Sequence, residues 1–237
     1  MKGVRIADKN IYSNEKYFDQ PKEYYKLILS EIKQFDNKIS RIIDIGCSNG
    51  SLLNFLMKQM SDKKITYVGY EPEKSLIEYG KKINKKILFN NYGLYEIPNL
   101  SNDEKGDVTI ASGVIGIFED PKKFINRLIE CTRSNGVVYI FSPFNEENID
   151  VILKYKYHNK KSWEIGHNLF SMASMESICK ELGYQYNWKP FKMPFSIKKT
   201  KDPMRSWTEK FRNDENQIIY GTNMFTTMKL LSIYKNT

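Results

Sequence analysis

The stretch RIIDIGCSNGSLL, residues 41–53, decides the fold. A short β-branched run ends at a glycine, and the apolar residues that follow recur at helical spacing, which predicts a strand, a tight loop and a helix. Gly46 permits a sharp turn, and Gly50 lets the helix pack closely. Ser48 stands where many such loops have a middle glycine, so the loop does not match the dinucleotide-binding pattern G-x-G-x-x-G.

The same alternation of strands and helices continues along the chain. The runs at 107–114 and 136–144 are apolar at nearly every position, which is typical of parallel strands buried on both faces. We therefore predict an α/β fold with a doubly wound, mostly parallel, seven-stranded type of sheet, helices on both faces and an antiparallel C-terminal hairpin. Further strands are expected at 65–71, 86–91, 184–195 and 224–235, and helices at 21–35, 72–83, 121–133 and 174–183, the first three opened by Pro21, Pro72 and Pro121.

The chain shows no internal repeat and no low-complexity linker, which predicts a single domain over residues 1–237. Residues 1–40 are expected to form an N-terminal helical cover, and residues 41–143 a ligand-binding core. Residues 144–237 then hold a polar and aromatic cap at 145–170, a helix and the C-terminal strands.

Charge is distributed unevenly along the chain, whose net charge is +9. Residues 1–149 hold 22 basic and 20 acidic side chains, whereas residues 150–237 hold 15 and eight. Such a surface favours anionic partners. Three well-separated cysteines, no long apolar run and no signal-like N-terminus argue against structural zinc, a membrane span and secretion. A cytoplasmic location without a membrane partner is therefore expected.

Two acidic residues follow predicted strands and indicate the ligand. Asp44 directly precedes the first glycine of the loop, where its carboxylate repels phosphate and attracts an ammonium group. Glu71 ends the second strand, where a carboxylate can accept hydrogen bonds from both ribose hydroxyls. A ribose and an amino acid without phosphate describe S-adenosylmethionine.

Four segments, in this order and spacing, resemble the class I S-adenosylmethionine-dependent methyltransferases: IIDIGCSNGSLL (42–53), YVGYEP (67–72), DVTIASGVIGIFEDP (107–121) and NGVVYIFSPFN (135–145). The segment HNLFSMASMESICKELGY (167–184) is similar to one found in the ubiquinone-like and sugar O-methyltransferase branch. The resemblance covers about residues 15–185 and implies an enzyme that uses S-adenosylmethionine and releases S-adenosylhomocysteine (SAH).

The resemblance also implies roles for residues at matching positions. The loop after the first strand contacts the methionine part of the cofactor, Asp44 anchors its ammonium and Glu71 holds its ribose. The other residues expected at the cofactor are Gly46, Cys47, Ser48 and Gly50 in the loop, Asn91 and Tyr92 near the adenine, Ser112 and Gly113 at the ammonium, and Tyr12 or Tyr17 as a cover.

The chemistry is less constrained than cofactor binding. Many relatives have Leu-Glu-His after the fourth strand, but this chain has Ile115-Gly116-Ile117, so a metal-dependent mechanism is disfavoured and no metal site is expected. An alcohol acceptor must lose a proton, and histidine titrates in the useful range. His167 is the first candidate for the base and His158 the second, with a structural role as the alternative for each. Cys47 fits a packing residue better than a nucleophile.

The acceptor is inferred from family branch and charge. We expect methylation of an oxygen, with nitrogen less favoured, on a small, phosphorylated or nucleotide-linked acceptor such as a sugar, nucleotide-sugar or surface-polysaccharide precursor. RNA is the less favoured acceptor, and a noncatalytic S-adenosylmethionine-binding regulator is a further alternative. Aromatic residues that either line an acceptor pocket or pack in the core are Tyr155, Tyr157, Trp163, Phe170, Trp188 and Trp207. Basic residues that either bind an anion or face solvent are Lys189, Lys192, Lys198, Lys199, Lys201, Arg205, Lys210 and Arg212.

Overall fold

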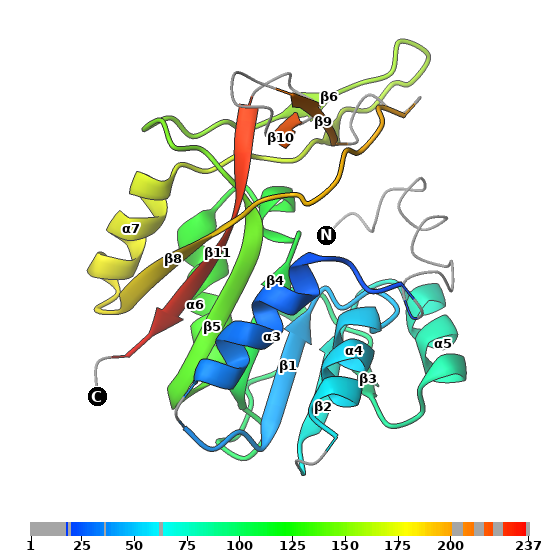
Figure 1. Ribbon diagram of the computed structural model, residues 1–237, viewed down its shortest axis with the longest axis vertical. Helices are drawn as coiled ribbons and strands as arrows, with labels where there is room; N and C mark the ends of the chain where they lie inside the picture. Colours follow the sequence, from blue (N-terminus) through cyan, green and yellow to red (C-terminus); the bar gives the residue numbers. More distant parts are fainter. Residues whose placement is uncertain are drawn as a thin grey trace.

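The computed structural model describes residues 18, 20–35, 37–61, 64–200, 206–210, 216–219 and 225–235. Its main sheet has the order β3-β2-β1-β4-β5-β11, with β8 and β10 both pairing with β11 (Figure 1). The first five strands are parallel, and β11 runs antiparallel to β5, β8 and β10. The strands are β1 (Arg41–Ile45), β2 (Thr66–Tyr70), β3 (Leu88–Asn90), β4 (Gly106–Ser112), β5 (Thr132–Phe144), β8 (Gln185–Phe191), β9 (Trp207–Lys210), β10 (Asn216–Ile219) and β11 (Phe225–Tyr234).

Helices cover both faces of this sheet. Two helices, α3 (Tyr24–Gln34) and α4 (Ser51–Gln59), contribute to one hydrophobic cluster, and α5 (Lys74–Ile83) lies beside α4. On the other face, α6 (Pro121–Glu130) and α7 (Met172–Glu181) contribute to a second cluster. The predicted doubly wound fold is therefore confirmed.

Alternate residues of the central strands pack in the two different clusters, because successive side chains of a strand point to opposite faces. In β1, Ile42 belongs to the cluster under α3 and α4, whereas Ile43 belongs to the cluster under α6 and α7. In β5, Phe141 and Phe144 divide in the same way. Burial on both faces explains why these strands read as continuous apolar runs.

The cap lies beyond the carboxyl ends of the parallel strands, at the top of Figure 1. It contains a two-stranded hairpin of β6 (Lys154–Tyr155) and β7 (Glu164–Ile165), which is separate from the main sheet. Asn145 N–H donates to the Phe170 carbonyl at 2.9 Å, so the two ends of the cap meet at the end of β5. No helix in the described segments is both long and apolar enough to span a bilayer.

Several predicted boundaries were wrong. Helices α3 and α5 begin at Tyr24 and Lys74, after their prolines rather than at them, whereas Pro121 is at the start of α6 as expected. The Glu73 side chain accepts a hydrogen bond from Ser75 N–H and so caps α5 one residue beyond Pro72.

The predicted C-terminal pair is interrupted. Strands β8 and β11 are antiparallel neighbours, but their connection contains β9 and β10. Strand β11 lies between β5 and β8, so the predicted antiparallel pair does extend the sheet beyond β5.

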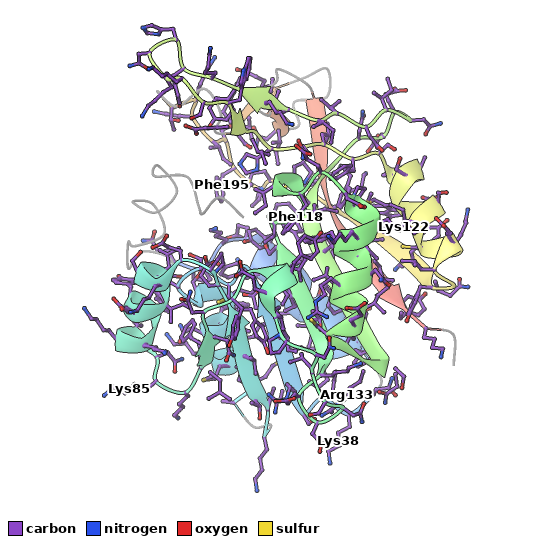
Figure 2. The ribbon with its side chains drawn as sticks, turned by 180° about the vertical axis from the view of Figure 1, so that it is seen from behind. Lys38, Lys85, Phe118, Lys122, Arg133 and Phe195 are labelled. Atoms are coloured by element: carbon purple, nitrogen blue, oxygen red, sulfur yellow. The ribbon has the colours of Figure 1, made fainter. Side chains whose placement is uncertain are left out.

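A buried carboxylate joins three segments at the amino end of the sheet. Asp107 Oδ2 accepts hydrogen bonds from Ser40 N, Ser40 Oγ and Arg41 N at 2.7–2.9 Å, and its Oδ1 lies 2.6 Å from Arg133 Nη1. Arg133 is at the end of the molecule opposite the cap (Figure 2). Burial alone would raise the pKa of Asp107, but the hydrogen bonds from Ser40, Arg133 and Arg41 hold it below its ordinary value.

We predict that Asp107→Asn lowers the free energy of unfolding by about 2 kcal/mol at pH 7, because charge-assisted hydrogen bonds are lost, with a discount for the partly exposed Arg133. A carboxyl whose pKa is lowered by folding contributes stability above its unfolded pKa, and that contribution is lost as the pH falls through the folded value. Urea unfolding at pH 7 and at about pH 3 should therefore show that the difference in unfolding free energy between the wild type and Asp107→Asn is smaller in acid. The exposed neighbour Asp103→Asn is the control, and an equal loss at both pH values would contradict the assignment.

Candidate functional site

The loop after β1 is shaped by three left-handed residues, Gly46, Ser48 and Gly50, whose φ angles are 70°, 53° and 78°. Gly46 N–H donates to the Tyr70 carbonyl at 2.8 Å, which holds the loop against the end of β2. A Cβ on Gly46 would lie 2.7 Å from Val114 Cγ2, and one on Gly50 would lie 2.6 Å from Phe89 Cζ. Both positions therefore require glycine for space as well as for conformation.

Glu71, directly after β2, is only 3% exposed and fixes the loop from the side. Its Oε2 accepts a hydrogen bond from Ser48 N–H and its Oε1 accepts one from Glu73 N–H, both at 2.9 Å. Burial raises the pKa of Glu71, and these two N–H groups partly offset the rise. Each carboxylate oxygen keeps a further lone pair, so Glu71 can hold the loop and also accept from a pair of ligand hydroxyls.

Asp44 and Glu71 place two buried carboxyl groups beside one loop. Asp44 is 3% exposed, and its pKa is raised well above the ordinary value by burial and by the charge of Glu71, while Lys22 opposes the rise. Burial, Asp44 and Glu71 also raise the pKa of Cys47, which keeps its thiol neutral. Such a site favours a ligand cation over an anion, and it does not activate Cys47 as a nucleophile.

Two buried hydroxyl groups at the strand ends have no hydrogen-bond partner in the structure, Ser48 Oγ and Ser112 Oγ. Buried hydroxyls are normally satisfied, so an unsatisfied pair at one sheet edge indicates a place where a polar ligand binds. Gly113 follows Ser112 with a φ of 70°, and a Cβ built there would meet no atom within 4 Å. The end of β4 therefore borders open space next to Ser112.

Asn91 and Tyr92 follow β3 and are exposed. Asn91 Nδ2 donates to the carbonyls of Glu71 and Pro72, both at 2.9 Å, so its amide group fixes the chain after β2. The adenine contacts expected of Asn91 and Tyr92 stay predictions, and the structure adds a structural role for Asn91.

The two candidate bases occupy different places. His167 is half-buried, and its Cα lies 3.6 Å from the position of a Cβ on Gly116, just beyond the end of β4. His158 is exposed in the turn of the cap hairpin, where Lys160 N–H donates to the Tyr157 carbonyl. Tyr12 and Tyr17 lie outside the described residues.

Asn168, which was not predicted from the sequence, connects the cap to the end of β4. Its side chain is 2% exposed, donates from Nδ2 to the Phe118 carbonyl at 2.7 Å and accepts at Oδ1 from Leu153 N–H at 2.9 Å. Its own N–H donates to the carbonyl of Gly116 at 2.7 Å. Gly116 belongs to the short 3-10 helix η2 (Ile115–Ile117), so Asn168 positions the neighbouring His167 relative to the end of β4.

Most aromatic candidates pack rather than line an open pocket. Phe170 and Trp207 are 2% and 6% exposed, and the ring of Trp188 packs edge-on against Phe144 with centroids 5.0 Å apart. Trp163 and Tyr157 are the exceptions, because they are 59% and 42% exposed. Of the basic candidates, Lys189 pairs with Glu31 at 3.5 Å and the Lys199 ammonium lies 4.5 Å from the centroid of the Trp207 ring, whereas Lys201, Arg205 and Arg212 lie outside the described residues.

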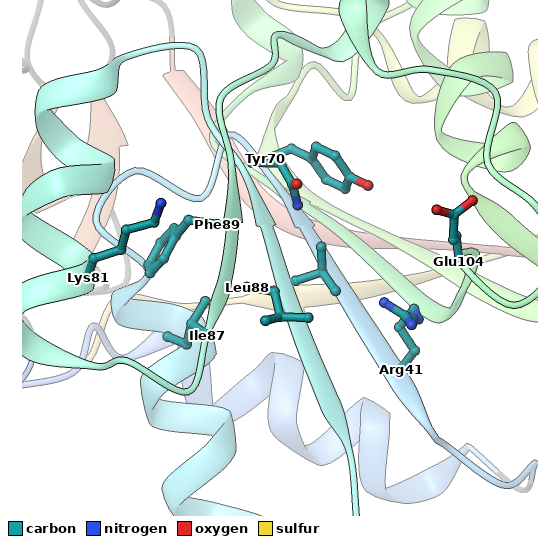
Figure 3. Close-up of a pocket in the computed structure, with 9 residues that line it drawn as sticks. Arg41, Tyr70, Lys81, Ile87, Leu88, Phe89 and Glu104 are labelled. Atoms are coloured by element: carbon teal, nitrogen blue, oxygen red, sulfur yellow. The ribbon is translucent and has the colours of Figure 1, made fainter.

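A hollow of about 490 Å³ lies elsewhere, around the edge strand β3 (Figure 3). Arg41, Tyr70 and Glu104 line one side, while Lys81 and Phe89 lie on the other. The connection from β3 to β4 contains only the 3-10 helix η1 (Leu94–Glu96) and therefore leaves this face of the sheet open. The hollow does not include the Asp44–Gly50 loop, and ligands of such sheets bind beyond the carboxyl ends of the strands.

Comparison with known proteins gives a consistent result. Residues 15–187 match a family model described as a methyltransferase domain. The chain is 28% identical over 162 residues to a tRNA U34 carboxymethyltransferase of Campylobacter jejuni, covering 65% of this chain and 53% of that protein. It is 27% identical over 146 residues to a malonyl-[acyl-carrier protein] O-methyltransferase of Acetivibrio thermocellus, covering 59% and 50%. The chain thus spans about half the length of the curated relatives it matches.

A similar fold occurs in the crystal structure of the plantazolicin methyltransferase BpumL, solved in complex with a triazolic desmethylPZN analog and SAH. The TM-score is 0.58 at 14% identity, and the match covers 98% of this chain and 92% of that one. At this identity the likeness shows the fold.

We predict that Asn168→Ala loosens the cap, because it leaves the Leu153 N–H and the Phe118 carbonyl without their partner. Each unsatisfied buried group costs about 1–3 kcal/mol, so unfolding should become easier by at least about 2 kcal/mol. Hydrogen exchange should speed up at Leu153 N–H more than at Val108 N–H within β4. Asn187→Ala, on the exposed face of β8, is the control, and unchanged exchange at Leu153 would refute the role of Asn168.

Proposed function

The chain belongs to the methyltransferase domain family, in its class I S-adenosylmethionine-dependent form, and on this premise we propose that it methylates a small anionic acceptor. The acceptor atom in this proposal is oxygen, with nitrogen less favoured. The acceptor is a sugar, nucleotide-sugar or surface-polysaccharide precursor. The observation that carries the proposal is the Asp44–Gly50 loop held against the buried carboxylate of Glu71.

The residues at this edge fit the cofactor. When bound, S-adenosylmethionine supplies a methyl group made electrophilic by a positively charged sulfur. Asp44 offers a buried negative charge to the ammonium group in the methionine part of the cofactor. The positive charge of that ammonium would in turn lower the raised pKa of Asp44. The free lone pairs of Glu71 suit the two ribose hydroxyls, and Ser48 Oγ and Ser112 Oγ gain polar partners.

The protein's main contribution to transfer is alignment, because the reaction is an in-line displacement. The residues of this chain would hold the acceptor oxygen in line with the methyl group that the bound cofactor supplies on its sulfur, and a side chain acting as a base would take up the proton of the acceptor hydroxyl. We assign His167 as this base, since it lies beside η2 just past the end of β4. Asn168 would then act as a positioning residue through the adjacent backbone.

Charge supports an anionic acceptor. The loop side of the site is acidic at Asp44 and Glu71, which suits the cationic cofactor, whereas the cap carries exposed lysines. One or two such cations suffice to bind a phosphate group. The lysines are therefore placed to attract the second substrate rather than the first.

RNA is the second candidate acceptor, because relatives include tRNA U34 carboxymethyltransferases. The match covers only 53% of those proteins, so nearly half of each one lies outside the alignment with this chain. A noncatalytic cofactor-binding regulator is the third alternative, and it requires the cofactor site without a base.

We predict that Glu71→Ala weakens SAH binding at least about 100-fold in calorimetry, because two hydrogen bonds to a charged group are lost. Gly46→Val should do the same by filling the loop. Glu78→Ala, an exposed acid in α5, is the matched control and should bind normally. Thermal denaturation separates lost binding from unfolding, and normal binding by both folded site variants would disprove the site assignment.

We predict that labelled S-adenosylmethionine transfers its methyl group to the anionic small-molecule fraction of a metabolite extract. Label in RNA instead would favour the second candidate, and no label in any fraction, with SAH binding intact, would favour the regulator.

On the identified acceptor, His167→Ala should lower kcat by about 100-fold or more while SAH affinity is kept. The variant His158→Ala, in the exposed turn, is the comparison that shows which of the two histidines acts as the base. Full turnover by His167→Ala would remove it as the base.

A further inference from the structure

Exposed apolar side chains are concentrated in the cap. Twelve large hydrophobic residues are exposed in the described part of the chain, and five of them lie within residues 145–170. Trp163 is the most exposed of the twelve, at 59%. Such a concentration on one projecting element is typical of an interaction surface. The five residues are Ile149, Ile152, Tyr157, Trp163 and Ile165.

Lysines alternate with these apolar residues in the cap hairpin, residues 154–165. Lys154 is directly opposite Ile165 in the β6–β7 register, and the Lys156 ammonium lies 5.6 Å from the centroid of the Trp163 ring. Lys160 and Lys161 are exposed at the turn. The hairpin has four lysines and a single acid, Glu164, which bonds to the Tyr155 hydroxyl at 3.0 Å.

The sequence alone predicts no membrane partner, but from these exposed side chains we propose that the cap hairpin docks on an anionic lipid surface. Isoleucine and tryptophan side chains enter the boundary between headgroups and acyl chains, while lysine stems lie along the apolar layer and place their ammonium groups among the headgroups. The Lys156–Trp163 pair has this arrangement. Lys156, Lys160 and Lys161 form no ion pair with another described residue, whereas Lys154 pairs with Glu119 at 2.8 Å.

The composition favours lipid over single-stranded RNA. Single-stranded RNA is bound by aromatic rings and arginine planes that stack on bases. Residues 149–200 contain no arginine, and three of the five exposed apolar residues of the cap are isoleucines, which have no ring to stack. Aliphatic side chains gain free energy in an acyl layer instead.

The position of the hairpin determines how the candidate site would face a lipid surface. The hairpin lies beyond the carboxyl ends of the parallel strands, while Lys38 and Arg133 mark the opposite end of the molecule (Figures 1 and 2). Docking would turn the carboxyl ends of the strands toward the bilayer. The proposal concerns binding alone and does not depend on methyl transfer.

The test is partition of the full chain onto phosphatidylcholine vesicles with and without phosphatidylglycerol, measured by sedimentation and by tryptophan emission. Trp163 is the sensitive reporter, because Trp207 is 6% exposed and Trp188 Nε1 donates to Glu176 at 3.0 Å. We expect binding only to the anionic vesicles, with an emission shift to shorter wavelength that Trp163→Phe removes.

Variants separate the apolar and basic contributions. Trp163→Ser and Ile165→Ser should each weaken partition about tenfold, and Lys156→Ser or Lys160→Ser about fivefold each. Matched controls outside the cap are Leu88→Ser, on the edge strand β3 and 52% exposed, and Lys85→Ser, far from the cap in Figure 2, both of which should bind normally. Circular dichroism checks that each variant is folded.

Three outcomes would overturn the proposal. The first is the absence of partition onto anionic vesicles, and the second is equal partition by the folded cap variants and the wild type. The third is binding of single-stranded RNA, rather than vesicles, that the cap variants lose.

Discussion

The carboxylate of Glu71 is the constraint on which the candidate site depends. One oxygen holds the loop after β1 through Ser48 N–H, and the other holds the turn into α5 through Glu73 N–H. Asn91, directly after β3, donates hydrogen bonds to the carbonyls of Glu71 and Pro72 and so joins the end of β3 to the chain after β2. The buried carboxylate therefore fixes the ends of β1 and β2 relative to each other, at a cost in desolvation that shows as its raised pKa, and the Asn91 amide fixes the end of β3 to the same chain segment.

Much of the geometry around Asp44 and Glu71 was predictable from the sequence, because its determinants are local. A strand that ends in Asp44 and Gly46, with another that ends in Glu71, sets the positions of the acids once the strands are parallel and adjacent. The fold class followed from the same alternation. Helix starts were less certain, since Pro121 opens α6 whereas Pro72 precedes the Glu73 cap of α5.

The acceptor side was not predictable in the same way, because its contacts join distant segments. Asn168 bonds to backbone groups 15 and 50 residues away, and nothing in its immediate sequence marks those partners. The hairpin β9–β10 was also missed, since its short strands occur in a basic, polar stretch without clear alternation. The adenine contact of Asn91 stays a prediction, whereas the hydrogen bond from its amide nitrogen to the Glu71 carbonyl was not foreseen. A side chain's partner depends on tertiary contacts that local periodicity does not encode.

The place of β11 has a consequence for how the chain folds during synthesis. Residues 227–234 pair with β5, about ninety positions earlier, and residues 228–234 also pair with β8. Helix α7 and β8 thus leave the ribosome before the strand that joins them to the parallel core. Until β11 emerges, the outer edge of β5 lacks its partner, and such unpaired edges are where intermediates aggregate. Completion of the sheet is therefore a late, long-range step, whereas the β1–α4–β2 unit with the Asp44–Gly50 loop consists of near neighbours and can form early.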